Sequence, residues 1–127
     1  MKFKYTILYV ENVASTLDFF KRAFDFKQKF LHESGDYGEL ETGNTTLAFS
    51  SLSLMQSLGK SPARAQPTAP IFEIAFESDD VRTDLSRALE SGAVLHQDIR
   101  DEPWGQTTAY VIDPNGFLIE ICSPVTG

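Results

Sequence analysis

The apolar positions in the first half of the chain follow two different periods. Side chains alternate over residues 3–10, which is typical of a strand with two distinct faces. From Val13 to Phe24 the apolar residues recur at spacings of three and four, which predicts an amphipathic helix with Asn12 as its N-cap. Runs of β-forming residues between turn residues predict three more strands, at 28–33, 37–42 and 45–52. The first half therefore has the order βαβββ.

The second half repeats this order after a linker. Residues 54–70 contain one glycine and three prolines, which predicts an irregular segment with one short helical turn near Met55. A strand at 71–77 then leads into a helix at 80–91, for which Ser78 or Asp79 is the expected N-cap and Gly92 the C-cap glycine. Three further strands are predicted at 94–100, 106–112 and 117–123.

The two halves align residue by residue. At an offset of 68 Tyr5 falls on Glu73, and at an offset of 72 Ala48 falls on Glu120. Two half-domains of this kind can join into one sheet and leave a cleft, so these four positions are the first candidates for function. A length of 127 residues suggests one α+β domain, with module one at about 1–53, the linker at about 54–70 and module two at about 71–124.

Composition and charge narrow the range of partners. The formal net charge of −7 argues against nucleic acid, which requires clustered Lys and Arg, and leaves room for a cationic or neutral small ligand. The single cysteine, Cys122, excludes an internal disulfide framework. No apolar run approaches the ~18 residues of a membrane span, and the first residues lack the apolar core of a signal peptide. We therefore expect a cytoplasmic protein with no membrane partner.

Four short sequences, in this order and spacing, resemble the vicinal oxygen chelate superfamily. They are VENVASTLDFF at residues 10–20, AFDF at 23–26, PWG at 103–105 and DPNGFLIE at 113–120. This superfamily includes glyoxalase I, bleomycin resistance proteins, extradiol dioxygenases and fosfomycin resistance enzymes. The resemblance covers nearly the whole chain. It implies two tandem βαβββ modules that form a cupped mixed sheet with the helices on its convex side, often in a homodimer that completes the site.

The resemblance also locates the positions at which metal-dependent members carry ligands. These members usually draw His or Glu ligands from the first and last strands of each module, which here correspond to Tyr5, Ala48, Glu73 and Glu120. Ala48 has no donor atom. Tyr5 is a poor ligand for a divalent metal at neutral pH, because a phenol ordinarily titrates at about pH 10. Only two carboxylates remain, whereas a catalytic zinc site normally has three protein ligands. We therefore expect a member with a degenerate metal site and no cofactor.

Strand alternation selects the residues that face the predicted cup. Tyr5, Ile7 and Tyr9 share one face of the first strand, and Glu73 and Glu120 face the cup from the second module. A carboxylate between apolar strand residues requires a partner, so each glutamate is either a ligand-binding group or one that is hydrogen-bonded to Tyr5 or to a strand neighbour. The candidate ligand-binding residues are Tyr5, Ile7, Tyr9, Glu73, Trp104 and Glu120.

Trp104 and the two histidines have less specific contexts. Trp104 follows Pro103 in a loop, where its ring could stack on a flat ligand or anchor the loop on the surface of the protein itself. His32 and His96 are isolated in strands without an orienting acid, so a structural or exposed role is expected for both.

Three functions remain open. The first is a metal-independent protein that resembles bleomycin resistance proteins and binds a flat or cationic small organic molecule in an acidic, aromatic cup. The second is a lyase, isomerase or epimerase in which Glu120 is the general base and Tyr5 the acid or oxyanion donor. The third is a degenerate module that acts through a dimer interface, in which case replacing Tyr5, Glu73 and Glu120 together changes nothing.

Overall fold

The chain folds into two compact units, each with one mixed sheet. The computed structural model describes residues 1–125, and the units are Met1–Arg64 and a second one that begins at Ala65. In the first unit the elements are β1 (Tyr5–Val10), α1 (Val13–Phe24), β2 (Gln28–Leu31), β3 (Tyr37–Leu40), β4 (Thr46–Ser51) and α2 (Leu52–Ser57). In the second unit they are β5 (Glu73–Glu77), α3 (Val81–Glu90), β6 (Val94–Asp101), β7 (Thr107–Ile112) and β8 (Leu118–Cys122). The predicted α+β class with two βαβββ modules is confirmed.

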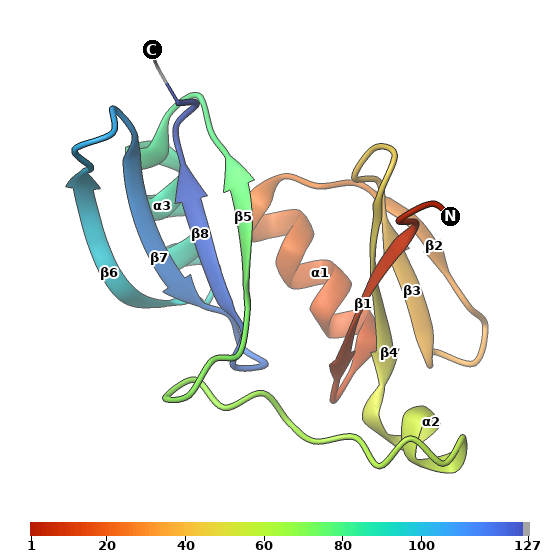
Figure 1. Ribbon diagram of the computed structural model, residues 1–127. Coiled ribbons are helices and arrows are strands. Elements are labelled where there is room, and N and C mark those ends of the chain that lie inside the picture. Colours follow the sequence, from red (N-terminus) through yellow and green to blue (C-terminus); the bar gives the residue numbers. More distant parts are fainter. Residues whose placement is uncertain (126–127) are drawn as a thin grey trace. The chain divides into compact units, whose positions relative to one another are not determined.

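The two sheets have the same topology (Figure 1). Their strand orders are β1-β4-β3-β2 and β5-β8-β7-β6, and in each sheet the first and last strands of the module run parallel while the other pairs are antiparallel. Each sheet therefore has a central strand that comes last in its module, β4 in the first unit and β8 in the second. The prediction that the two sheets form one cup stays a prediction.

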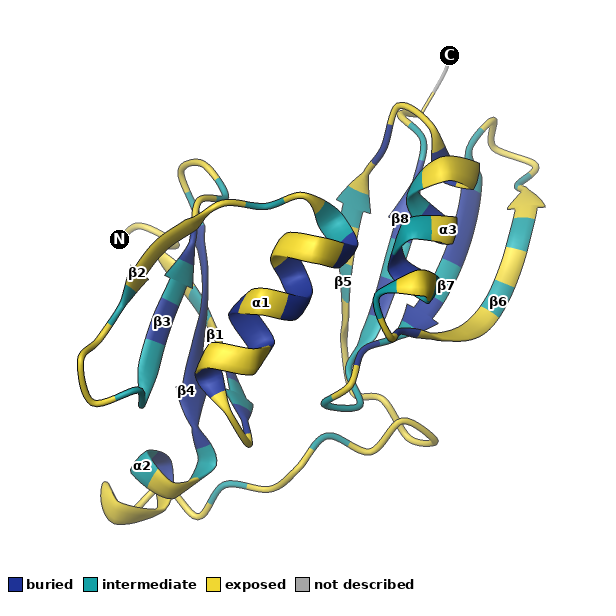
Figure 2. Ribbon diagram, turned by 180° about the vertical axis from the view of Figure 1, so that it is seen from behind, coloured by how far each residue is buried: buried dark blue, intermediate teal, exposed yellow. Residues whose placement is uncertain are grey.

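One helix covers one face of each sheet (Figure 2). In the first unit the apolar stripe of α1 packs on β3 and β4, with the rings of Phe20 and Phe49 5.0 Å apart. Gly38 permits this close approach, since a Cβ built there would lie 2.7 Å from Leu17 Cδ1. In the second unit Leu85 and Ala88 of α3 are buried on the same side as the core of its sheet. The opposite face of each sheet carries the polar and aromatic side chains considered below.

Most element boundaries agree with the sequence prediction, and the differences have local causes. The helix at Val13–Phe24 and its Asn12 cap are as predicted, and α2 is the predicted helical turn near Met55. The predicted N-cap of α3 was wrong. Asp80 is the cap and accepts a hydrogen bond from the Thr83 amide, because the Ser78 hydroxyl is engaged with the amide of Asp80 and with the Asp84 carboxylate.

Candidate functional site

A tyrosine hydroxyl lies between two carboxylates on the open face of the second unit's sheet. Tyr110 Oη is 2.6 Å from Glu120 Oε2 and 3.1 Å from Glu73 Oε2, and it can donate its proton to either oxygen. The three side chains come from β7, β8 and β5, so the group spans three adjacent strands. Glu73 and Glu120, which alternation predicted to share a face, are thus brought together, and the partner of Glu120 is a strand neighbour, not Tyr5.

Strand register places Tyr110 in this group. Tyr110 lies opposite Glu120 in the antiparallel β7–β8 pair, and Ala75 lies beside Glu120 in the parallel β5–β8 pair. The sequence analysis missed Tyr110. A signal for it was present, because the turn after Asp113 sets the register of the hairpin and thereby the residue opposite Glu120.

The electrostatics of this group are those of an anionic site. Burial, followed by the adjacent Glu120 and Glu73 carboxylates, raises the pKa of the Tyr110 phenol above its ordinary value, so the hydroxyl remains a donor at neutral pH. Among residues 1–125 no lysine or arginine forms an ion pair with Glu73 or Glu120. We call Glu73, Tyr110 and Glu120 the acidic triad.

The net charge of the protein resides in the second unit. Residues 65–127 contain three arginines and no lysine against eleven Asp and Glu, for a formal charge of −8, whereas residues 1–64 contain eight Lys and Arg against seven Asp and Glu, for +1. An excess of this size attracts cations to the surface that carries it. The acidic triad is therefore part of a broader negative field.

A second polar group lies on β6 and β7 and is neutralised internally. The Glu102 carboxylate accepts hydrogen bonds from Arg100 Nε at 2.6 Å and from Thr108 Oγ1 at 3.0 Å. The Arg100 contact holds the pKa of Glu102 below its usual range. Because Glu102 already has a cationic partner, it is a structural group, in contrast to the glutamates of the acidic triad.

Trp104 is oriented but not covered. Its indole N–H donates to Gln106 Oε1 at 2.7 Å, and Gln106 Nε2 in turn donates to the Ser123 carbonyl at 3.0 Å. The residue is nevertheless 56% exposed, so its ring is not buried as a loop anchor would be. An indole fixed by its N–H with an exposed ring can stack on a flat group.

The remaining predicted residues lie on the sheet of the first unit. Tyr5, Ile7 and Tyr9 occupy one face of β1, opposite the buried Leu8 and Val10, as alternation predicted. Tyr5 and Ile7 are 46% and 42% exposed, and Tyr9 is half-buried. The prediction that they line one cup with Glu73 and Glu120 stays a prediction.

The donor set at the four family positions does not fit a divalent metal. Ala48 presents a methyl group, fully buried between its neighbours, and Tyr5 presents a phenol. The two remaining donors, Glu73 and Glu120, both engage the Tyr110 hydroxyl. In the described part of the chain no three His, Cys, Asp or Glu side chains are grouped as metal ligands would be. His96 is exposed on β6.

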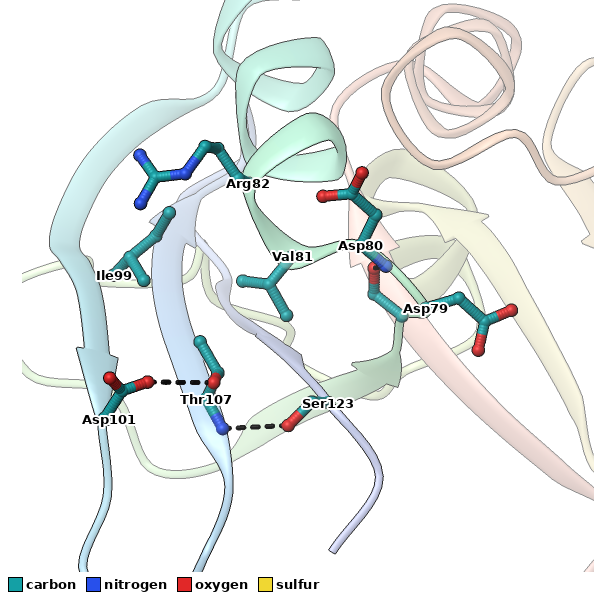
Figure 3. A pocket seen from close by; sticks show the side chains of 9 residues that line it. Asp79, Asp80, Val81, Arg82, Ile99, Asp101, Thr107 and Ser123 are labelled. Atoms are coloured by element: carbon teal, nitrogen blue, oxygen red, sulfur yellow. Dashed lines mark hydrogen bonds between the residues drawn. The ribbon is translucent and has the colours of Figure 1, made fainter. Parts of the chain in front are cut away.

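A separate pocket of about 360 Å³ opens on the helix side of the same sheet (Figure 3). It lies between the N-terminal turn of α3 and the ends of β6 and β7. Thr107 is hydrogen-bonded there through its hydroxyl to Asp101 Oδ1 and through its amide to Ser123 Oγ. Thr107 points away from the face that carries Tyr110, since the two are three positions apart on one strand. None of the candidate ligand-binding residues predicted from the sequence lines this pocket.

Comparison with known proteins agrees with this architecture. The profile of the glyoxalase-like domain matches residues 3–126. No curated protein matches the chain. None of the helices in residues 1–125 has the length and apolar character needed to cross a bilayer.

Several solved structures share the fold. A glyoxalase/bleomycin resistance protein/dioxygenase family enzyme from Burkholderia phytofirmans PsJN has a TM-score of 0.83 at 18% identity, over 99% of this chain and all of that one. A glyoxalase-related enzyme from Fulvimarina pelagi has a TM-score of 0.83 at 16% identity, over 98% and 88% of the two chains. TioX from Micromonospora sp. ML1 has a TM-score of 0.73 at 19% identity, over 97% and 98%. With its repeated βαβββ modules and the profile match over nearly its full length, the chain belongs to the glyoxalase-like domain family of the vicinal oxygen chelate superfamily.

Proposed function

We propose that this protein binds a small cationic organic molecule on the open face of the second unit's sheet, without a metal. The observation that carries the proposal is the acidic triad. One tyrosine proton is shared between two carboxylates, and neither carboxylate has a cationic partner among residues 1–125. A carboxylate offers about four acceptor sites, so one shared hydroxyl leaves much of the acceptor capacity of Glu73 and Glu120 unused.

The chemistry of the triad favours a cation that carries several N–H donors. A primary ammonium, an amidine or a guanidinium can bridge two carboxylates through charge-assisted hydrogen bonds, each worth roughly 1.5–3 kcal/mol. The charge of −8 on the second unit increases the local concentration of such cations. Trp104 supplies an exposed ring for a flat part of the ligand.

A further element of the proposal, a homodimer, comes from the family resemblance. The similar structures include glyoxalase/bleomycin resistance protein/dioxygenase family proteins. The resemblance to bleomycin resistance proteins supports binding as the function.

Titration with matched amines tests binding. Benzylamine and benzamidine would be titrated into the full chain by calorimetry, with benzyl alcohol as the neutral analogue. The double variant Glu73→Gln, Glu120→Gln is expected to weaken amine binding tenfold or more, since it removes both charge-assisted acceptors. Glu77→Gln is the matched control, because Glu77 lies on the same strand and face as Glu73 but does not contact Tyr110. Absence of saturable amine binding, or equal affinity in the double variant, refutes the proposal.

The contact between Tyr110 and Glu120 favours a second candidate, an enzyme of the same superfamily. Glu120 would act as general base, and Tyr110 would take the role of oxyanion donor that the sequence analysis gave to Tyr5. A phenol whose pKa is raised suits this role because it stays protonated. Here Glu120→Gln abolishes turnover and leaves ligand affinity unchanged, whereas the binding proposal requires a loss of affinity.

A further inference from the structure

The open face of the first unit's sheet combines aromatic rings with a single carboxylate. Strand pairing places side chains from the four strands in one row across the sheet. Along this row Ile7 of β1 lies beside Ala48 of β4, which lies beside Glu39 of β3. Glu39 in turn lies beside Phe30 of β2. Tyr37 and Tyr9 flank Ser50 in the same way. We call this surface the aromatic face, and its members are Tyr5, Ile7, Tyr9, Phe30, Tyr37 and Glu39.

Ala48 carries no carboxylate, but Glu39 on the neighbouring strand β3 does. In the second unit the central strand carries Glu120 and its neighbour on β7 carries Tyr110. In the first unit the central strand carries Ala48, and its neighbour on β3 carries Glu39, which accepts a hydrogen bond from Tyr37 Oη at 2.7 Å. Each of the two faces therefore carries a carboxylate that accepts a hydrogen bond from a tyrosine hydroxyl.

The charge of Glu39 has no cationic partner among the described residues. Its surroundings are aromatic, with the Phe30 ring 6.4 Å from that of Tyr37. Tyr5 and Phe30 are both nearly half exposed, so the face is open to a ligand.

One contact within the protein already places a cation near a ring of this face. Lys4 Nζ lies 5.8 Å from the centroid of the Tyr5 ring, within the range of a cation–π interaction. Aromatic rings around a carboxylate differ from the acidic triad in what they recognise. Rings stabilise a cation without hydrogen-bond donors, and N-alkylated ammonium ions are bound in this way.

We propose that the aromatic face is a second binding site, selective for N-alkylated ammonium groups. The positive charge would lie beside the Glu39 carboxylate, with the N-alkyl groups against the rings of Tyr5, Phe30 and Tyr37. The site shares no residue with the acidic triad, so it stands or falls independently of the function proposed above.

The charge requirement is tested with choline and its neutral isostere 3,3-dimethylbutan-1-ol. Both are titrated into the full chain and followed by NMR chemical shifts of the protein. We expect saturable binding of choline, in the millimolar range that a few cation–π contacts support, and none of the alcohol. Equal shifts from the two compounds, or no saturation by choline, overturn the proposal.

Paired variants locate the site. Glu39→Gln keeps an acceptor for the Tyr37 hydroxyl and removes the charge, and it is expected to weaken choline binding about fivefold or more. Glu90→Gln makes the same chemical change at an exposed position on α3, outside both proposed sites, and is expected to leave choline binding within about twofold. Tyr5→Leu, at an exposed position, serves as a second variant if Glu39→Gln does not fold, and should weaken binding by removing a ring. Unchanged choline affinity in the folded Glu39 or Tyr5 variant, or an equal loss in Glu90→Gln, refutes the assignment.

Discussion

The turn between β7 and β8 buries an aspartate whose protonation should control stability. Asp113 is only 3% exposed, and its Oδ1 accepts hydrogen bonds from the amides of Asn115 and Phe117, at 3.0 and 2.8 Å. Its Oδ2 is buried without a hydrogen-bond partner. Burial outweighs the backbone hydrogen bonds and raises the pKa of Asp113 to about 6, from an ordinary 3.8. Replacing Asp113 by asparagine removes this ionisation.

The expected magnitude follows from linkage. The folded state binds the proton more tightly than the unfolded state, so this group lowers the free energy of unfolding as the pH rises from about 4 to about 6. A difference of about two pKa units corresponds to about 3 kcal/mol. The stability of Asp113→Asn relative to the parent should therefore rise by about 3 kcal/mol between pH 4 and pH 7.5. Burying the asparagine side-chain amide changes the free energy of unfolding by an amount that is the same at every pH, so it does not alter the expected difference.

Urea denaturation of both proteins across this pH range measures the difference. All other carboxylates titrate in both proteins and cancel in the comparison. Asp79→Asn makes the same chemical change at an exposed position just before α3 and is the control. If the difference for Asp113→Asn stays constant, or falls as the pH rises, the account of a buried, partly unsatisfied carboxylate is wrong.

Three further predictions concern packing, capping and ionisation. Gly38→Ala should lower the free energy of unfolding by about 1–3 kcal/mol, because the new methyl group would meet Leu17 Cδ1 at 2.7 Å; thermal denaturation checks this, and an unchanged midpoint contradicts it. Asn12→Ala should cost about 1 kcal/mol in the same assay through loss of the α1 cap, whereas Asn12→Asp should cost little. In an alkaline absorbance titration Tyr37 and Tyr110 should ionise later than free tyrosine, since burial and adjacent carboxylates raise both pKa values. Tyr110→Phe should remove one late-ionising group, and an unchanged number of such groups would argue against the raised value.

Local patterns in the sequence were sufficient for the elements and for two of the three residues of the acidic triad. Spacings of three and four fixed α1 to the residue, because helix periodicity and the Asn12 cap act within a few residues. Strand ends were less accurate, as with β1, which begins at Tyr5 and not at Phe3. Alternation correctly placed Glu73 and Glu120 on one face.

The site residues that were not predicted from the sequence are those whose neighbours depend on the register between strands. Tyr110 and Glu39 were overlooked because they lie on the third strand of each module, whereas the family comparison drew attention to the first and last. Their positions follow only when the hairpin turns are used to count across strands, which pairs Tyr110 with Glu120 and Glu39 with Ala48. Alternation assigns a residue to a face, but only pairing identifies its neighbours.

The strand order of the two sheets also bears on the order of events during synthesis. β8 comes last in its module, yet it lies between β5 and β7 and, among residues 1–125, is the only strand that joins them. Glu73 can therefore meet Tyr110 only once residues 118–122 have been made and inserted. The first unit closes with β4 at residue 51, and chains emerge from the ribosome N-terminus first. A nascent chain should thus acquire the aromatic face well before the acidic triad, so that the two proposed binding sites form one after the other.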